Sequence, residues 1–117
     1  MRRAAIVTPL RTPVGKFLGA LSSVSAIDLA STVVKALVER SGVDPARIDD
    51  VVFAQSYANG EAPCIGRWAA LAADLPIEVP GLQLDRRCGG GLQAIATAAM
   101  MVQTGAADVS SPAASRA

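Results

Sequence analysis

Apolar and polar positions along the chain follow two periods, one typical of strands and one typical of helices. Short apolar or β-branched runs predict strands at residues 4–7, 49–57 and 78–85, and a fourth strand opens at residues 106–109. Apolar residues at a spacing of about three to four predict helices between Ser25 and Gly42 and at residues 64–75 and 89–104. Strands that alternate with helices in this way predict βαβ units with right-handed crossovers around a mostly parallel sheet, which is an α/β fold.

Several predicted elements carry signals at their ends. Ser25 followed by Asp28 resembles a capping box at the start of the first helix, and Gly42 is suited to end that helix. Asp44 and Pro45 predict a short helical turn in which Asp44 is the cap. These signals fix the ends of the elements more firmly than periodicity alone.

The helix predicted at residues 89–104 contains no charged residue and is nearly apolar all round. Such a helix belongs in an interior, and a sheet covers only one of its sides, so we expect it to need a second layer. After Val109 the sequence reads SSPAASRA and loses its β-branched residues. We therefore expect a domain at residues 1–109 and a tail at residues 110–117 that is disordered or foreign to the parent fold.

Composition and charge narrow the class of protein. The chain has 117 residues, of which 51% are hydrophobic and 3% aromatic, with 11 basic and 10 acidic residues. This describes one folded domain or a piece of a larger one, without the basic block of a nucleic-acid-binding surface. The apolar run after Arg2 and Arg3 is too short for a signal peptide or a membrane span, so we expect a cytoplasmic location. Two cysteines and no histidine exclude the usual zinc patterns, and we expect no bound metal.

Cys88 lies where the third predicted strand gives way to the uncharged helix. Its sulfur would be near free backbone N–H groups and the positive end of the helix dipole. A free cysteine has a pKa of about 8.5, and such positions lower it to roughly 3.5–7.5, which favours the nucleophilic thiolate. Gly89, Gly90 and Gly91 leave room for close approach of a substrate such as a thioester. On these facts alone Cys88 is also compatible with a core position beside a turn, and Cys64, which lacks such a junction, is the weaker candidate.

Three motifs, in order along the chain, resemble the N-terminal part of thiolases, the acetyl-CoA acetyltransferase family. They read RTPVGKFLGALSSVSAIDLA near the start, VVFAQSYANG after the first helix and DRRCGGGLQAI around Cys88. The resemblance runs from about Ala4 to Val109. It implies a partial thiolase N-terminal domain of βαβαβα order with a mostly parallel sheet, truncated after the start of the fourth strand.

The resemblance also implies a chemistry. Cys88 would be the nucleophile that accepts the acyl group of an acyl-CoA, with its backbone N–H as a donor of an oxyanion hole. The acyl-enzyme would then condense with a second acyl-CoA, or thiolysis would run in reverse, in a ping-pong sequence. Gly89, Gly90 and Gly91 are expected to bind substrate through close backbone approach. The implied partners are acyl-CoA and coenzyme A, as substrates rather than cofactors, with a homo-oligomer in the full-length family and neither nucleic acid nor membrane.

The sequence departs from the family pattern around this cysteine and elsewhere. Gly90 stands where the family usually has serine, and Asp85, often asparagine in the family, places an anion near the proposed thiolate. In thiolases the activating histidine and a second catalytic cysteine come from the C-terminal half, and this sequence has no histidine, so we expect the polypeptide alone to be inactive. Two alternatives stay open. One is a non-catalytic association module that uses the uncharged helix, and the other is a different cysteine-dependent condensing enzyme, such as a ketoacyl synthase, against which RTPVGKF argues.

Overall fold

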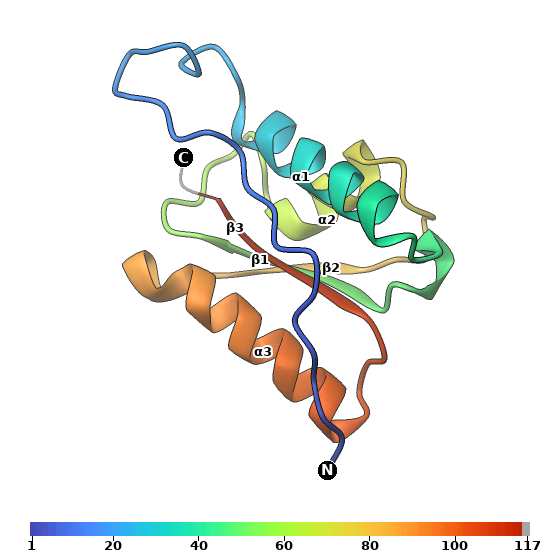
Figure 1. Ribbon diagram of the computed structural model, residues 1–117. Coiled ribbons are helices and arrows are strands. Elements are labelled where there is room, and N and C mark those ends of the chain that lie inside the picture. Colours follow the sequence, from blue (N-terminus) through green and yellow to red (C-terminus); the bar gives the residue numbers. More distant parts are fainter. Residues whose placement is uncertain (116–117) are drawn as a thin grey trace.

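A three-stranded parallel sheet lies between two helical layers in the computed structural model, which describes residues 1–115 (Figure 1). The strands, in spatial order, are β2 (Gly81–Leu84), β1 (Asp50–Gln55) and β3 (Ser110–Ser115). The helices are α1 (Ala26–Ser41), α2 (Ile65–Ala72) and α3 (Gly90–Thr104). Figure 1 shows α1 and α2 on one face of the sheet and α3 on the other. The predicted α/β fold with a parallel sheet is confirmed.

The side chains of the central strand β1 alternate between two hydrophobic clusters. Val51 and Phe53 pack with residues of α1 and α2 on one face of the sheet. Val52 and Ala54 pack with residues of α3 on the other face. All four side chains are buried, as expected for a central parallel strand covered by helices on both sides.

Helix α1 begins and ends where its capping residues predict. The Ser25 hydroxyl oxygen accepts a hydrogen bond from the Asp28 backbone N–H at 3.1 Å, which satisfies one of the free donors of the first turn. Gly42 ends the helix in the left-handed region, with a φ of 69°, and its N–H donates to the Val38 carbonyl oxygen. The predicted boundaries of this helix are confirmed.

The loop between α1 and β1 contains two carboxylates that accept backbone N–H groups. Asp44 caps the short 3-10 helix Pro45–Arg47 by accepting a backbone N–H from two residues further on, as predicted. The Asp49 carboxylate accepts the backbone N–H groups of Asp108 and Val109, at 2.6 and 3.0 Å. These bonds, the one from Val109 first, lower the pKa of the Asp49 carboxyl below its ordinary value. Asp49 thereby ties the start of β1 to the residues that lead into β3.

Helix α2 approaches the sheet closely because glycines lie at the contact. A Cβ atom on Gly66 would lie 2.3 Å from the Leu82 carbonyl oxygen and 2.4 Å from the Val51 carbonyl oxygen. A Cβ atom on Gly81 would lie 2.3 Å from the Arg67 backbone nitrogen. Only a hydrogen atom fits at either position. This contact holds β2 directly under α2, and β2 leads from there to Cys88.

Helix α3 covers the other face of the sheet with its smallest residues. Ala94 and Ala98 are buried against β1, whereas Leu92 and Met100 are 75% and 51% exposed. The helix ends before Gly105, which has a φ of 79°, as predicted. The uncharged helix therefore has one covered side and one open apolar side in this chain.

The strand predicted at residues 4–7 is wrong. The N-terminal segment crosses the gap between α1 and α3 without joining the sheet, and Ile6 and Val7 are 70% and 68% exposed (Figure 1). Both edges of the central strand are occupied, by β2 and β3, so the apolar run has no edge of β1 to pair with. The segment is held at its start instead, where the Arg2 side chain pairs with Asp108 and the Arg2 N–H donates to the Gln103 carbonyl oxygen at 3.2 Å.

Strand β3 covers residues 110–115, for which the sequence predicts a disordered or foreign tail. It pairs with the whole of β1, from Asp50 opposite Ser110 to Gln55 opposite Ser115. The difference has a physical reason: the pairing uses backbone groups, and Asp49 fixes the chain just before the strand begins. Residues 116 and 117 lie outside the described residues, and the division into a domain at 1–109 and a tail stays a prediction.

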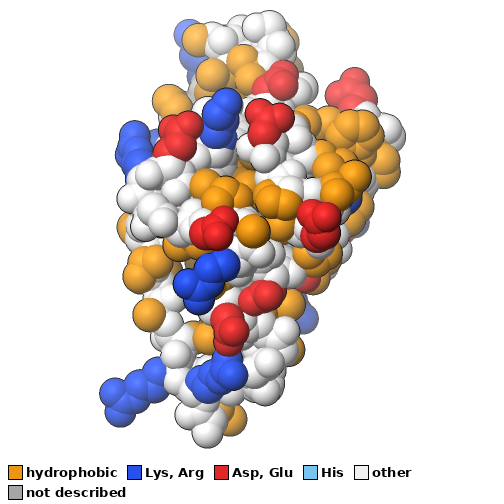
Figure 2. All heavy atoms as spheres, turned by 90° about the vertical axis from the view of Figure 1, so that its right-hand side faces the viewer, with side chains coloured by type: hydrophobic (Ala, Val, Ile, Leu, Met, Phe, Trp, Pro, Cys, Tyr) orange, Lys and Arg blue, Asp and Glu red, His pale blue; other side chains and the backbone are white. Residues whose placement is uncertain are grey.

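The surface carries charges of both signs. Figure 2 shows acidic and basic side chains interspersed among apolar ones on the face that it presents. This distribution accords with the formal net charge of +1. Within residues 1–115, no helix has both the length and the apolar character needed to span a membrane.

Candidate functional site

The candidate site forms where the carboxyl ends of β1 and β2 meet. The two strands are parallel, and Ala54 pairs with Leu84, so both chains leave the sheet at the same edge. Ser56 follows β1 there, and Asp85 follows β2. The carboxyl edge of a parallel sheet is where α/β proteins commonly place binding and catalytic side chains.

A tight turn links β2 to α3 and contains the 3-10 helix Arg87–Gly89. The Asp85 carboxylate accepts the Arg87 backbone N–H at 2.8 Å, and the Gly89 N–H donates to the Arg86 carbonyl oxygen at 2.9 Å. Arg87 has a φ of 42°, in the left-handed region that a residue with a long side chain rarely adopts. The turn is therefore held in a strained conformation by its own hydrogen bonds.

Cys88 lies in this turn, two residues before the first residue of α3, and its side chain is exposed. The structure thus places the cysteine at the strand-to-helix junction that the sequence predicts. The free backbone N–H groups and the positive end of the α3 dipole lie at this end of the helix. Among the described residues, the Cys88 thiol has no hydrogen-bond partner. This arrangement leaves the sulfur open to an electrophile.

The three glycines after Cys88 have different surroundings. Gly90 is buried, and a Cβ atom there would lie 2.9 Å from the Ala54 Cβ, so this glycine lets the start of α3 rest on β1. Gly89 is exposed, and Gly91 lines a neighbouring cavity. Substrate binding by Gly89, Gly90 and Gly91 stays a prediction.

The side chain of Arg87 joins the ends of both strands. Its Nη1 donates to the Asp85 carboxylate at 2.7 Å and also to the Ser56 carbonyl oxygen. The Ser56 hydroxyl in turn donates to the Arg87 carbonyl oxygen at 3.0 Å, and the guanidinium lies over the Tyr57 ring, 5.4 Å from its centroid. The sequence indicates only that at most one of the neighbouring Arg86 and Arg87 points toward the site. It contains no signal for these contacts, because Ser56 lies 31 residues away along the chain.

Cys64 has a different environment from Cys88. It caps the start of α2 in the left-handed region, with a φ of 55°, and its thiol donates to the Gly81 carbonyl oxygen at 3.2 Å. This hydrogen bond joins α2 to the start of β2. Cys64 therefore has a structural contact, in agreement with its lower rank as a candidate for chemistry.

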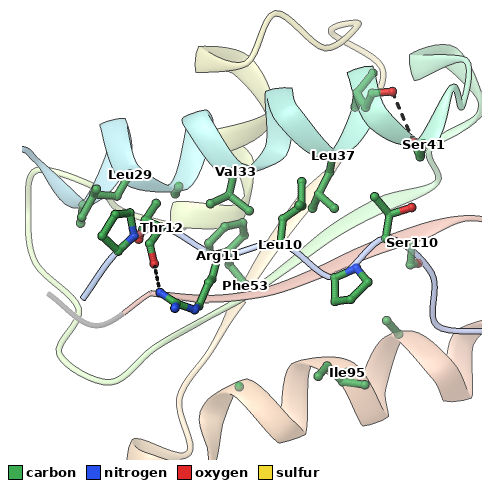
Figure 3. A pocket seen from close by; sticks show the side chains of 18 of the residues that line it. Leu10, Arg11, Thr12, Leu29, Val33, Leu37, Ser41, Phe53, Ile95 and Ser110 are labelled. Atoms are coloured by element: carbon green, nitrogen blue, oxygen red, sulfur yellow. Dashed lines mark hydrogen bonds between the residues drawn. The ribbon is translucent and has the colours of Figure 1, made fainter.

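A cavity of about 1290 Å³ lies between the N-terminal segment, α1 and α3. Figure 3 shows Val33 of α1, Phe53 of β1 and Ile95 of α3 around this space. Its wall contains Gly91 but not Cys88. Neither cysteine lines this cavity, so we assign the cavity to the gap that opens where the N-terminal segment stays off the sheet.

Comparison with known proteins gives a consistent set of relatives. The family model described as thiolase, N-terminal domain, matches residues 4–110. A probable acetyl-CoA acetyltransferase of Escherichia coli is 40% identical over 109 residues, covering 93% of this chain and 28% of that protein. A steroid 3-ketoacyl-CoA thiolase of Mycobacterium tuberculosis is 41% identical over 110 residues, covering 93% of this chain and 27% of that protein.

A solved structure is similar to this chain in both fold and sequence. The crystal structure of the Bacillus anthracis acetyl-CoA acetyltransferase matches with a TM-score of 0.87 and 37% identity, covering 90% of this chain and 27% of that chain. The chain thus spans 27–28% of the length of these relatives.

Proposed function

Because the chain belongs to the thiolase family, through its N-terminal domain, we propose that Cys88 accepts the acyl group of an acyl-CoA. The observation that carries this proposal is the exposed thiol of Cys88 in the turn between β2 and α3. Of the two cysteines, it is the one whose sulfur lies at the start of a long helix without a hydrogen-bond partner among the described residues. Thiolates in such positions are good nucleophiles.

The proposed step is acyl transfer between two sulfur atoms. The Cys88 thiolate attacks the thioester carbonyl carbon, a new carbon–sulfur bond forms, and the bond to the coenzyme A sulfur breaks. Coenzyme A leaves as a thiolate and takes up a proton. Backbone N–H groups at the start of α3 are the donors that would stabilise the oxyanion formed during the attack.

The second half of the reaction regenerates the thiolate. The α-carbon of a second acyl-CoA, after losing a proton, attacks the carbonyl carbon of the acylated Cys88. A carbon–carbon bond forms, the bond to the Cys88 sulfur breaks, and a 3-ketoacyl-CoA is released; thiolysis is the same path in reverse. This half requires a base for the α-proton, and a histidine base is absent from the sequence. We therefore propose that the polypeptide of this sequence alone accepts an acyl group but does not turn over.

Acylation of the thiols by acetyl-CoA tests the first half. The chain is incubated with acetyl-CoA, digested and analysed by mass spectrometry, with hydroxylamine used to show that the linkage is a thioester. We expect Cys88 to be acetylated about tenfold faster than Cys64, because the latter thiol is engaged by the Gly81 carbonyl. The C64S variant serves as the matched control and should keep the rate, whereas C88S should lose the label.

Two results would contradict these proposals separately. Equal labelling of both cysteines would remove the assignment of Cys88 as the nucleophile. Steady thiolysis of acetoacetyl-CoA by the purified chain would leave that assignment intact and overturn the proposed need for residues that this sequence lacks.

The open side of α3 supports a second proposal, association with another copy of the chain. Leu92 and Met100 are exposed on this helix, and the helix carries no charge that would repel its own copy. Sedimentation at rising concentration should show a dimer, and Leu92→Glu should make the chain monomeric. A monomer at all concentrations would exclude this mode of association.

A further inference from the structure

We propose that Arg87 is a positioning residue for Cys88, which balances the charge of Asp85 and fixes the turn that carries the thiol. This inference rests on the proposed role of Cys88 as the nucleophile. Arg87 precedes Cys88 directly, and its guanidinium contacts Asp85, which follows β2, and Ser56, which follows β1.

The contacts of Arg87 close a ring between the two strand ends. Asp85 accepts both the backbone N–H and the guanidinium of Arg87, at 2.8 and 2.7 Å. Ser56 accepts from the guanidinium through its carbonyl oxygen and donates its hydroxyl to the Arg87 carbonyl oxygen. Arg87 is therefore bonded, through both its backbone and its side chain, to residues that follow two different strands, and these bonds hold its backbone in the left-handed conformation.

The charge of Asp85 gives these contacts a chemical consequence. The Asp85 carboxylate accepts the backbone N–H of the residue next to Cys88, and an anion in this turn disfavours ionisation of the thiol unless a cation balances it. Arg87 supplies that cation at hydrogen-bond distance. The guanidinium and the carboxylate are 65% and 41% exposed in their side chains, so we expect an effect that salt weakens.

Few other charged groups lie around this turn. Helix α3, which packs on it, contains none. On the β2 side the remaining charge is Arg86, and after β1 the titratable groups are Tyr57, under the Arg87 guanidinium, and Glu61 in the cavity wall. Arg86 makes no ion pair within the described residues, so it offers a matched control for Arg87.

The test is the pH dependence of Cys88 alkylation by iodoacetamide in a C64S background at low ionic strength. Arg87→Met should move the midpoint of the alkylation profile upward by about half a pH unit, the order expected for a solvent-exposed charge near the thiol. Asp85→Asn alone should move the midpoint downward by a similar amount, because it leaves the Arg87 charge unbalanced. Asp85→Asn in the Arg87→Met background should restore most of the original midpoint.

A control variant distinguishes the effect of the Asp85–Arg87 ion pair from the effect of any positive charge near the turn. Arg86→Met removes the same charge one position away but leaves the Asp85–Arg87 pair intact, so it should move the midpoint less than Arg87→Met does. If Arg87→Met does not fold, as judged by circular dichroism, the cycle is run with Arg87→Lys, which keeps the charge but loses the double contact. Arg87→Lys should then raise the midpoint by less than about half a pH unit, and Asp85→Asn should lower it again in that background.

The proposal is overturned if Asp85→Asn leaves the midpoint of the Arg87→Met variant unchanged, or if Arg86→Met and Arg87→Met behave alike. Alkylation needs neither coenzyme A nor turnover, so it can succeed when acetylation by acetyl-CoA fails. That combination would remove the proposed acyl transfer and leave the role of Arg87 in place.

Discussion

Gly90→Ala is the change that most directly probes how α3 is seated behind Cys88. The added Cβ would lie 2.9 Å from the Ala54 Cβ, whereas non-bonded carbon atoms prefer about 3.5–4.0 Å. The helix or the strand must therefore move by about 0.6–1.1 Å. Both backbones lie in the packed layer between α3 and β1, where overpacking typically costs about 1–3 kcal/mol.

Helix propensity acts in the opposite direction but is smaller at this position. Alanine is favoured over glycine by about 0.8–1.0 kcal/mol in a helix interior, and Gly90 is only the first residue of α3. We therefore expect a net loss of about 1–2 kcal/mol in the free energy of unfolding. Urea denaturation followed by circular dichroism measures this loss as a lower midpoint at an unchanged slope.

Two further variants make the assignment specific. Gly60→Ala adds a Cβ into open space, so its stability should stay within about 0.5 kcal/mol of the parent. Ala54→Gly removes the atom that clashes, and the double variant should be more stable than the sum of the single effects by about 1 kcal/mol. A Gly90→Ala variant as stable as the parent, or strict additivity with Ala54→Gly, would refute this account of the contact.

The remaining predictions concern the sheet and its pH dependence. Gly66→Ala should prevent folding, as seen by loss of the cooperative thermal transition, because its Cβ would meet two backbone carbonyl oxygens at 2.3 and 2.4 Å; a normal melt would contradict this. Asp49→Asn should lower the melting temperature at neutral pH and converge with the parent at low pH. The pKa of the Asp49 carboxyl is lowered, so its contribution is present above the unfolded value and lost as the pH falls. Asp50→Asn should do the reverse: burial raises the pKa of the Asp50 carboxyl, so its ionisation costs stability as the pH rises, and melts from pH 3 to 8 should show the variant gaining over the parent.

Sequence reasoning succeeded where the determining interactions are short in range. The ends of α1 follow from a hydroxyl three residues before an N–H and from a glycine that adopts a left-handed conformation. The position of Cys88 follows likewise, since a strand pattern runs directly into a helical one at that residue. These signals lie within one turn of the residues they control, so tertiary contacts rarely override them.

The predicted N-terminal strand failed because a strand is defined by its partner as well as by its residues. Residues 4–7 have the apolar character of a buried strand, but the sequence does not show which chain occupies each edge of β1. In the structure β3 occupies that edge, although its residues have low strand propensity and include Pro112. β3 pairs with β1 in register over its whole length, and this backbone pairing stabilises β3 although its side chains have low strand propensity.

The same limit applies to charge at the candidate site. From the sequence, Asp85 is a nearby anion that would hinder ionisation of Cys88, because its spacing along the chain is all that can be judged. The fold changes this interpretation, because parallel pairing of β1 with β2 places Ser56 beside the turn. The Arg87 guanidinium then donates to the Ser56 carbonyl oxygen and to the Asp85 carboxylate together. The charge that matters for Cys88 is then that of the Asp85–Arg87 pair, and its effect depends on a strand end 31 residues before Arg87 in the chain. A departure from a family motif is therefore best judged after its neighbours across the sheet are known.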